Sequence, residues 1–240
     1  MIKTFIVGIV LAFGNGGTMA DCSDDNPTLT AWKAGEKVSD GDVKRFGIEN
    51  CFVSEAISDS VFDVMKGKTY KTNCTVPRSE LRYVKVLHRN IKGETMLGEL
   101  VCNKDVATDF LAIFRKLYEA KYPIERMVLI DNYNAEDEPS MEANNTSCFN
   151  FRFVARTKKL SNHSKGRAID INPLYNPYVK RHSNGTLHVS PKGSRKYADR
   201  SKSFNYKIDH SDLCFKLFKQ HGFTWGGDWE SLKDYQHFEK

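Results

Sequence analysis

Two histidines and two aspartates stand in two short motifs in the C-terminal third of the chain. The first motif, Ser161 to Asp170, contains His163, and the second contains Asp234 and His237. Two histidines and one carboxylate are the protein ligands of a catalytic zinc, whose fourth position stays open for the water nucleophile. The spare carboxylate is a natural general base. These residue types predict one zinc ion per chain and a zinc peptidase.

The first motif ends in a predicted strand over residues 168–172. Its two isoleucines alternate with small or polar residues, so they would face the core while Asp170 points to the opposite side. Gly166 permits a tight turn, which would bring His163 back beside Asp170. The strand would hold the carboxylate rigidly.

The second motif places Asp234 three residues before His237. In a turn or a helix that spacing lets both side chains converge on one metal-bound water. Taken alone, the segment would be interpreted as an exposed polar tail. Together with the first motif it predicts the general base and a further metal ligand.

The ends and the composition of the chain predict an exported protein. Residues 1–20 carry Lys3, an apolar run and small residues up to Ala20, as in a cleaved signal peptide. Removing them takes away one lysine and no acid, so the net charge falls from +6 to +5. That charge suits an anionic cell wall and is too weak for nucleic acid. We expect a soluble monomer in the periplasm, the cell wall or the medium, without membrane insertion.

Six cysteines are an even number, which in an exported chain allows up to three disulfides. Six cysteines allow 15 pairings, and their spacing does not choose among them. No C-x-x-C pair occurs, which argues against a zinc ribbon or a thioredoxin-like site. Buried free thiols are the alternative.

The rest of the chain predicts one α+β domain over residues 46–240, in which helices flank a small antiparallel sheet. Residues 21–45 lack a long apolar period and are interpreted as an irregular N-terminal extension. Alternating residues predict a hairpin from 81–88 and 96–101. Helical spacing of apolar residues predicts a helix over 105–118, which Pro123 stops.

Two further apolar segments and one polar segment complete the prediction. Residues 127–130 are expected to form a short strand. A second helix is expected from Ser211, ending before Gly222, with these side chains inward: Leu213, Cys214, Leu217 and Phe218. The polar segment 173–203 is either a substrate-facing rim or a solvated loop.

The pattern S-x-H-x-x-G-x-A-x-D at 161–170, the later D-x-x-H at 234–237 and the connecting segment 222–229 resemble the zinc D-alanyl-D-alanine carboxypeptidase family. This family includes the L-alanyl-D-glutamate endopeptidases and shares its fold with the Hedgehog signalling domain. The resemblance covers about residues 80–240. It implies a Hedgehog/DD-peptidase-like fold.

The resemblance also implies roles for individual residues. His163, Asp170 and His237 would be the zinc ligands and Asp234 the catalytic base. Many carboxypeptidase members have glutamate at the base position, so the aspartate here is more similar to the endopeptidase branch. Asp228 could rival Asp234, but it stands nine residues before the last histidine, and we expect a structural role for it.

Other side chains have two interpretations each. Arg152 resembles an arginine near the scissile carbonyl, where it would hold the oxyanion or clamp a substrate carboxylate, but a surface salt bridge is an equal alternative. Ser161 resembles a substrate-contacting serine, or its hydroxyl stabilises a turn. Trp225 and Trp229 could wall the cleft, although core packing is more common for such residues.

The leading hypothesis is hydrolysis of a peptide bond in peptidoglycan stem peptides, with metal-bound water as the nucleophile. The sequence leaves open whether the enzyme is an endopeptidase or a carboxypeptidase, and the aspartate base favours the former. The alternative function is a non-catalytic wall- or peptide-binding module that keeps zinc as a structural element.

Overall fold

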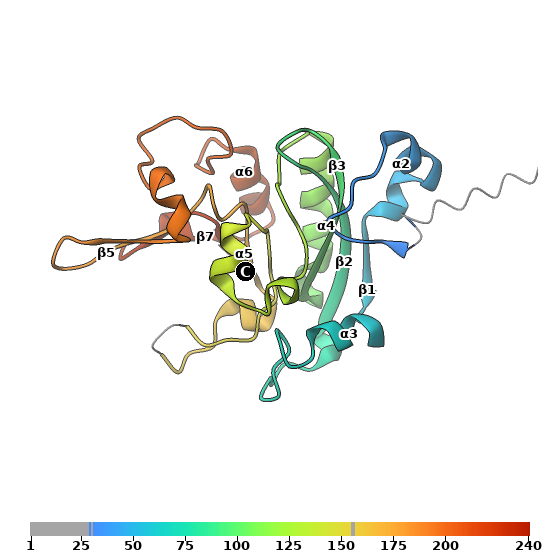
Figure 1. The fold of residues 1–240 in the computed structure, drawn as a ribbon, viewed down its shortest axis with the longest axis horizontal. Coiled ribbons are helices and arrows are strands. Elements are labelled where there is room, and N and C mark those ends of the chain that lie inside the picture. The colour runs from blue at the N-terminus through green and yellow to red at the C-terminus, as the bar shows by residue number, and fades with distance from the viewer. Residues whose placement is uncertain (1–28, 30, 155–156) are drawn as a thin grey trace, which may run out of the picture.

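The computed structural model describes Leu29, residues 31–154 and residues 157–240. Helices pack against three small antiparallel sheets of three strands each (Figure 1). This arrangement confirms the predicted α+β class, although one sheet was expected and the structure has three. The predicted signal peptide lies outside the described residues. Within the described part, no helix is both long enough and apolar enough to cross a membrane.

The first sheet contains β1 (Val53–Ala56), β2 (Leu81–Arg89) and β3 (Thr95–Asn103), in that order. The predicted hairpin is β2 and β3, and its turn is held by the side chain of Asn90, which accepts from two backbone N–H groups. Alternate residues of β2 face opposite layers of the core. The sheet is therefore covered on both sides.

The helix α4 (Lys104–Glu119) packs on one face of this sheet (Figure 1). It begins where the Asn103 side chain accepts from the N–H of Asp105, and it ends before Lys121, which has a φ of 55°. Its apolar stripe is buried, and each such side chain stabilises the fold by about 1.5–3 kcal/mol: Val106, Phe110, Ile113, Phe114 and Leu117. The predicted helix 105–118 is confirmed.

Two further sheets carry the C-terminal motifs. The second has the order β4 (Ala168–Asp170), β9 (His237–Glu239) and β7 (Thr224–Trp225). The third has the order β6 (Leu187–Ser190), β5 (Tyr178–Arg181) and β8 (Lys233–Asp234), and its β5–β6 hairpin projects at the left of Figure 1. Strands β8 and β9 are consecutive in the chain, so the second motif joins the two sheets.

The helix α6 (Leu213–Gln220) anchors the second sheet to the core. Phe218 stacks on Phe238 of β9, with ring centroids 4.4 Å apart, and packs edge-on against Phe110 of α4. The remaining helices are α2 (Asp40–Phe46), α3 (Asp59–Met65) and α5 (Asp137–Glu142). Short 3-10 turns occupy Ile48–Cys51, Arg78–Glu80, Ile130–Tyr133, Asn162–Lys165, Lys192–Tyr197 and Gly226–Asp228.

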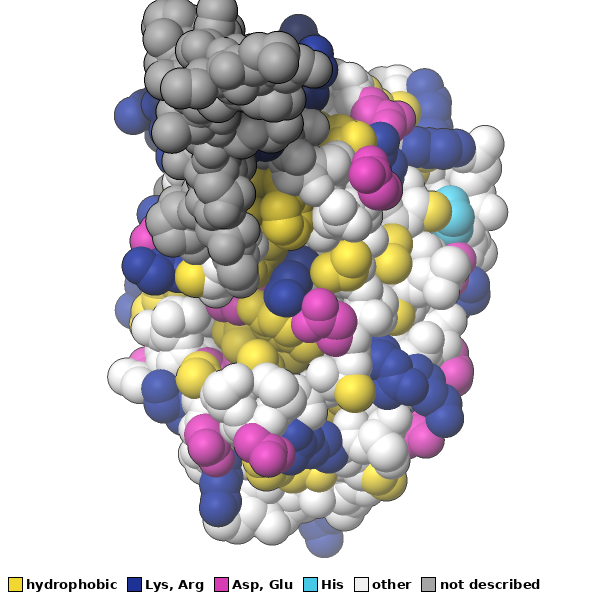
Figure 2. All heavy atoms as spheres, turned by 90° about the vertical axis from the view of Figure 1, so that its right-hand side faces the viewer, with side chains coloured by type: hydrophobic (Ala, Val, Ile, Leu, Met, Phe, Trp, Pro, Cys, Tyr) yellow, Lys and Arg dark blue, Asp and Glu magenta, His cyan; other side chains and the backbone are white. Residues whose placement is uncertain are grey.

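The expected irregular extension 21–45 is wrong for its last residues, which form the start of α2. Ser39 caps this helix. Val43 and Trp32 pack in one apolar cluster with Leu87 of β2 and Leu97 of β3. The face that carries α2 and β1 mixes basic and acidic side chains around exposed apolar ones (Figure 2). On the part of this face that the described residues form, basic side chains are interspersed with acidic and apolar ones.

Three local predictions need correction. Residues 127–130 form no strand, because the backbone of Val128 bonds the Asn145 side chain in place of a neighbouring strand. The second helix begins at Leu213, where Asp212 caps it, and Leu213 itself is exposed. The segment 173–203 is not one irregular loop, since it contains the β5–β6 hairpin.

The disulfide prediction is wrong for the five cysteines that the structure describes: Cys51, Cys74, Cys102, Cys148 and Cys214 are free thiols. All except Cys74 are buried among apolar side chains, where they pack as small hydrophobic residues. Burial raises the pKa of Cys51 to about 11. The sixth, Cys22, lies outside the described residues.

Candidate metal centre and active-site cleft

The structure brings His163, Asp170 and His237 together, although 74 positions separate the two histidines. The Nε2 of His163 lies 3.2 Å from the Nδ1 of His237. The carboxylate oxygens of Asp170 lie 3.0 Å from His237 Nδ1 and 3.3 Å from His163 Nε2. All three side chains are buried. The two ring nitrogens and the carboxylate, which uses a different oxygen for each contact, therefore form a small triangle.

Local backbone structure places each corner of this triangle. Asp170 of β4 is directly opposite His237 of β9 in the second sheet. His163 lies in the 3-10 turn before β4, and Gly166 ends that turn with a φ of 67°. A Cβ on Gly166 would come within 2.6 Å of the Asn103 backbone nitrogen. Both the left-handed conformation and the close approach require glycine there, as the sequence predicts.

Hydrogen bonds fix which nitrogen of each histidine is free. The Nδ1 of His163 lies 2.7 Å from the carbonyl oxygen of Cys148, which can only accept, so this nitrogen carries the proton. The Nε2 of His237 lies 3.0 Å from the carboxylate of Glu239. Each neutral ring then turns an unprotonated nitrogen toward the triangle. Such outer partners orient metal-binding histidines and fix their tautomers.

The donor set fits zinc. In a tetrahedral site with bonds of about 2.0–2.1 Å, ligand atoms are about 3.3 Å apart, close to the spacing of the triangle. Two facing nitrogen lone pairs and a carboxylate need a cation between them. Without a metal, burial lowers the pKa of His237, but its bonds with Asp170 and Glu239 outweigh burial and raise that pKa to about 10. The corresponding pKa of Asp170 lies well below its usual range, because both histidines outweigh its burial.

Asp234 lies next to this cluster at the end of β8. Its Oδ1 is shielded from solvent and has no hydrogen-bond partner among the described residues. Burial, and then the negative charge of Asp170, raise the pKa of Asp234 to about 6. Gly226 makes this packing possible, because a Cβ there would come within 2.8 Å of the Cβ of Asp234. The exposed-tail interpretation of the second motif is wrong.

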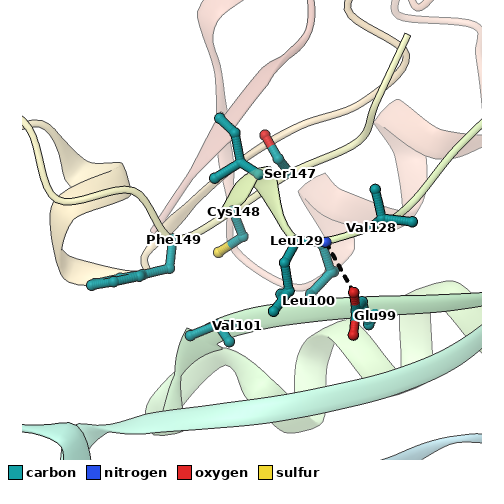
Figure 3. Close-up of a pocket in the computed structure, with 9 residues that line it drawn as sticks. Glu99, Leu100, Val101, Val128, Leu129, Ser147, Cys148 and Phe149 are labelled. Atoms are coloured by element: carbon teal, nitrogen blue, oxygen red, sulfur yellow. Dashed lines mark hydrogen bonds between the residues drawn. The ribbon is translucent and has the colours of Figure 1, made fainter. Parts of the chain in front are cut away.

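The cluster opens into a cleft of about 780 Å³. One wall is the β5–β6 hairpin, another comes from residues 152–154 and 157–163, and Trp229 lies over His237 with ring centroids 5.2 Å apart. A second cavity, between β3 and residues 128–130 and 147–149, measures only about 10 Å³ (Figure 3). That space holds one water at most, so it is no substrate site.

Arg152 and Ser161 both line the cleft. The Nε of Arg152 lies 2.7 Å from a carboxylate oxygen of Asp137, but its N–H does not point along this contact, so the pair is electrostatic. The salt-bridge interpretation of Arg152 therefore has direct support. Ser161 caps the 3-10 turn by accepting from the N–H of His163 at 3.3 Å, as a turn-stabilising hydroxyl would.

Asp228 and Trp225 behave as the sequence predicts. Asp228 is half exposed and pairs with His210 at 2.7 Å, away from the cleft lining. Trp225 is buried in the core.

Sequence reasoning missed two features of the site. Glu239 orients His237 and also accepts from Asn162 at 2.8 Å; its position two residues after the histidine on one strand was a usable signal, because such residues share a face. The β5–β6 hairpin was also missed, although Asn184-Gly185 between alternating residues is a strong hairpin signal.

Comparison with known proteins gives one result. Residues 155–240 match the family model described as D-alanyl-D-alanine carboxypeptidase. Neither the curated proteins nor the solved structures gave a match. The matched region covers about a third of the chain and contains the cluster of His163, Asp170 and His237, together with Asp234 and the β5–β6 hairpin. The C-terminal part of this chain is therefore similar to D-alanyl-D-alanine carboxypeptidases, which supports a peptidase function.

Proposed function

We propose that this chain is an exported zinc peptidase that hydrolyses a peptide bond in peptidoglycan stem peptides. The observation that carries the proposal is the buried triangle of His163, Asp170 and His237 beside an unpartnered carboxylate oxygen of Asp234, all lining one large cleft. The family match supports a peptidase, and the predicted signal peptide supports a substrate outside the cytoplasm.

The chain's own residues divide the work as follows. His163, Asp170 and His237 would hold zinc, which when bound supplies a Lewis acid and lowers the pKa of water. Asp234 accepts a proton from the attacking water and passes it to the nitrogen of the leaving amine as the C–N bond breaks. In the metal-free protein, burial and the charge of Asp170 raise the pKa of Asp234 to about 6, which makes this carboxylate a stronger base than an ordinary aspartate.

Treating purified muropeptides with the protein tests the proposal. We expect cleavage of a stem-peptide bond that stops with a chelator and returns with added zinc, read by mass spectrometry. Asp234→Asn should lose cleavage, and Asp228→Asn should keep it, because Asp228 pairs with His210 outside the cleft. Absence of any zinc-dependent cleavage would refute the proposal.

A comparison of two substrates identifies which bond the enzyme cuts. A free stem pentapeptide and its C-terminally amidated form differ only in the terminal charge. Cleavage of both forms identifies an endopeptidase, which the aspartate base favours. Cleavage of the free acid alone, with release of D-alanine, identifies a carboxypeptidase, as in the description of the matched family.

A non-catalytic binding module is the competing function. A binding module gains nothing from a shielded carboxylate oxygen without a hydrogen-bond partner, because such an atom costs about 1–3 kcal/mol. The oxygen of Asp234 is in that state. An unchanged biological effect of Asp234→Asn would favour the binding module.

A further inference from the structure

The β5–β6 hairpin turns one face toward the cleft. Tyr178 and Lys180 from β5 line the cleft, as do His188 and Ser190 from β6. These residues form two directly opposed pairs, Tyr178 with Ser190 and Lys180 with His188. Successive side chains on a strand point to opposite sides, so the residues between them face away. The hairpin therefore forms one wall of the cleft with two cross-strand pairs of side chains.

This wall is continuous with the strand that carries the proposed base. Asp234 of β8 is directly opposite Tyr178 of β5, so the base and the wall belong to one sheet. Lys180 is two residues further along β5, which is about 7 Å. An extended peptide advances by a similar distance in two residues. A substrate bound beside Asp234 therefore presents groups one or two residues from the scissile bond to Lys180.

The charges in the cleft single out Lys180. Arg152, Lys159 and Lys180 are the long cationic side chains of its lining. Arg152 is already neutralised by Asp137. Within the described part of the chain, no carboxylate lies within ion-pair distance of either lysine. Lys159 lies in a bend, whereas Lys180 stands on a strand of a sheet, which positions a binding group more accurately.

We propose that Lys180, with His188 beside it, binds a substrate carboxylate that lies one or two residues from the scissile bond. The inference rests on the proposed function and names a specificity determinant of the same site. An ammonium group donates charge-assisted hydrogen bonds to a carboxylate. Stem peptides offer two such groups, the C-terminal carboxylate and the α-carboxylate of a D-glutamyl residue.

Binding measurements on zinc-loaded Asp234→Asn protein test the proposal without turnover. The ligands are a stem pentapeptide, its C-terminal amide and its D-glutamyl α-amide, titrated by calorimetry. Lys180→Met in this background should weaken binding of the free peptide about tenfold. One amide should bind equally with and without Lys180→Met, and that amide identifies the carboxylate. Lys180→Arg should restore most of the affinity.

Two matched variants control for general charge. Lys159→Met removes a cation from the same cleft, and Arg181→Met removes one from the next position of β5, on the opposite face. Both should change binding less than twofold. Three results would overturn the assignment. Lys159→Met and Lys180→Met could weaken binding equally, Lys180→Met could bind as tightly as its parent, or no stem peptide could bind at all.

Hydrolysis by otherwise unmodified protein separates this inference from the proposed function. Lys180→Met should raise KM about tenfold and leave kcat nearly unchanged. If no variant hydrolyses stem peptides but the carboxylate-dependent binding persists, the proposed function fails and the role of Lys180 stands. If hydrolysis is zinc-dependent but insensitive to Lys180→Met, the function stands and the role of Lys180 fails.

Discussion

In the small cavity beside β3, Glu99 lies against Tyr83 and Leu129, whereas in the large cleft Asp234 lies against the cluster of His163, Asp170 and His237. Burial raises the pKa of both carboxyl groups. Glu99, however, accepts from the Tyr83 hydroxyl at 2.5 Å and from the Leu129 N–H at 3.2 Å, the bond drawn in Figure 3. Asp234 keeps an oxygen without a partner.

The comparison shows that a raised pKa alone does not identify a functional acid. Glu99 is a structural group, because its partners come from the protein and its cavity admits no substrate. Asp234 lines a cleft, and its Oδ1, although shielded from solvent, has no hydrogen-bond partner among the described residues. Perturbed acids mark candidate sites, and unmet hydrogen-bonding capacity beside a large cleft distinguishes Asp234 from Glu99.

The metal ligands should give the largest effect. His163→Ala or His237→Ala leaves two protein ligands, which hold zinc far more weakly than three. We expect loss of retained zinc and loss of activity by more than about 1,000-fold. Elemental analysis of purified variants measures the first, and peptide cleavage the second. Full zinc occupancy in the His237→Ala protein would show that the triangle is not the metal site.

Asp234→Asn should come next, with an activity loss on the order of 100- to 10,000-fold. Zinc content should stay unchanged, because Asp234 is not a ligand. The metal-free variant should be at least as stable as the parent at neutral pH, because the substitution removes a buried negative charge close to Asp170. A metal-free Asp234→Asn protein would mean that this carboxylate is itself a ligand.

Glu99→Ala should behave in the opposite way. It leaves the Tyr83 hydroxyl and the Leu129 N–H without their partner, so unfolding should become easier by about 2–3 kcal/mol. Chemical denaturation measures this change. The folded fraction should keep normal activity and zinc content. Loss of activity with intact stability would contradict the structural role of Glu99 and the distinction drawn between Glu99 and Asp234.

Glu239→Gln should weaken zinc binding about 10- to 100-fold, because the carboxylate orients His237 and raises its basicity. Competition with a chelator measures this affinity. Asn162→Ala is the matched variant, since it removes a neutral partner of the same carboxylate, and its effect should be smaller. Equal zinc affinity of Glu239→Gln and the parent would exclude an orienting role.

The pH dependence of stability should be the smallest and most specific effect. In the metal-free protein the pKa of His237 is about 10, above its unfolded value of about 6.5. Its protonation therefore stabilises the fold fully below pH 6.5, and this contribution disappears as pH rises toward 10. Thermal unfolding across that range should show the loss in metal-free protein. Zinc should suppress it, because the metal replaces the proton, and His237→Gln should also lack it.

The hairpin β2–β3 and the helix α4 were predictable because their signals are local. Alternating residues fix which side of a strand is buried, and apolar residues every three or four positions fix one face of a helix. Residues 127–130 show where this reasoning ends. Four apolar residues suit a strand, but Asn145, brought in by the tertiary fold, takes the backbone hydrogen bonds of Val128.

The chemical groups of the site follow directly from the amino-acid sequence: two histidines, two aspartates and the glycine at position 166, whose backbone conformation other residues avoid. The tertiary structure decided what those groups do. Only the pairing of β4 with β9 sets the donor atoms 3.0–3.3 Å apart. The packing of β8 beside β5 places Asp234 and Lys180 in one cleft, and the Oδ1 of Asp234 has no partner there among the described residues. Distances between residues far apart in the chain depend on all the packing between them, so no local pattern encodes them.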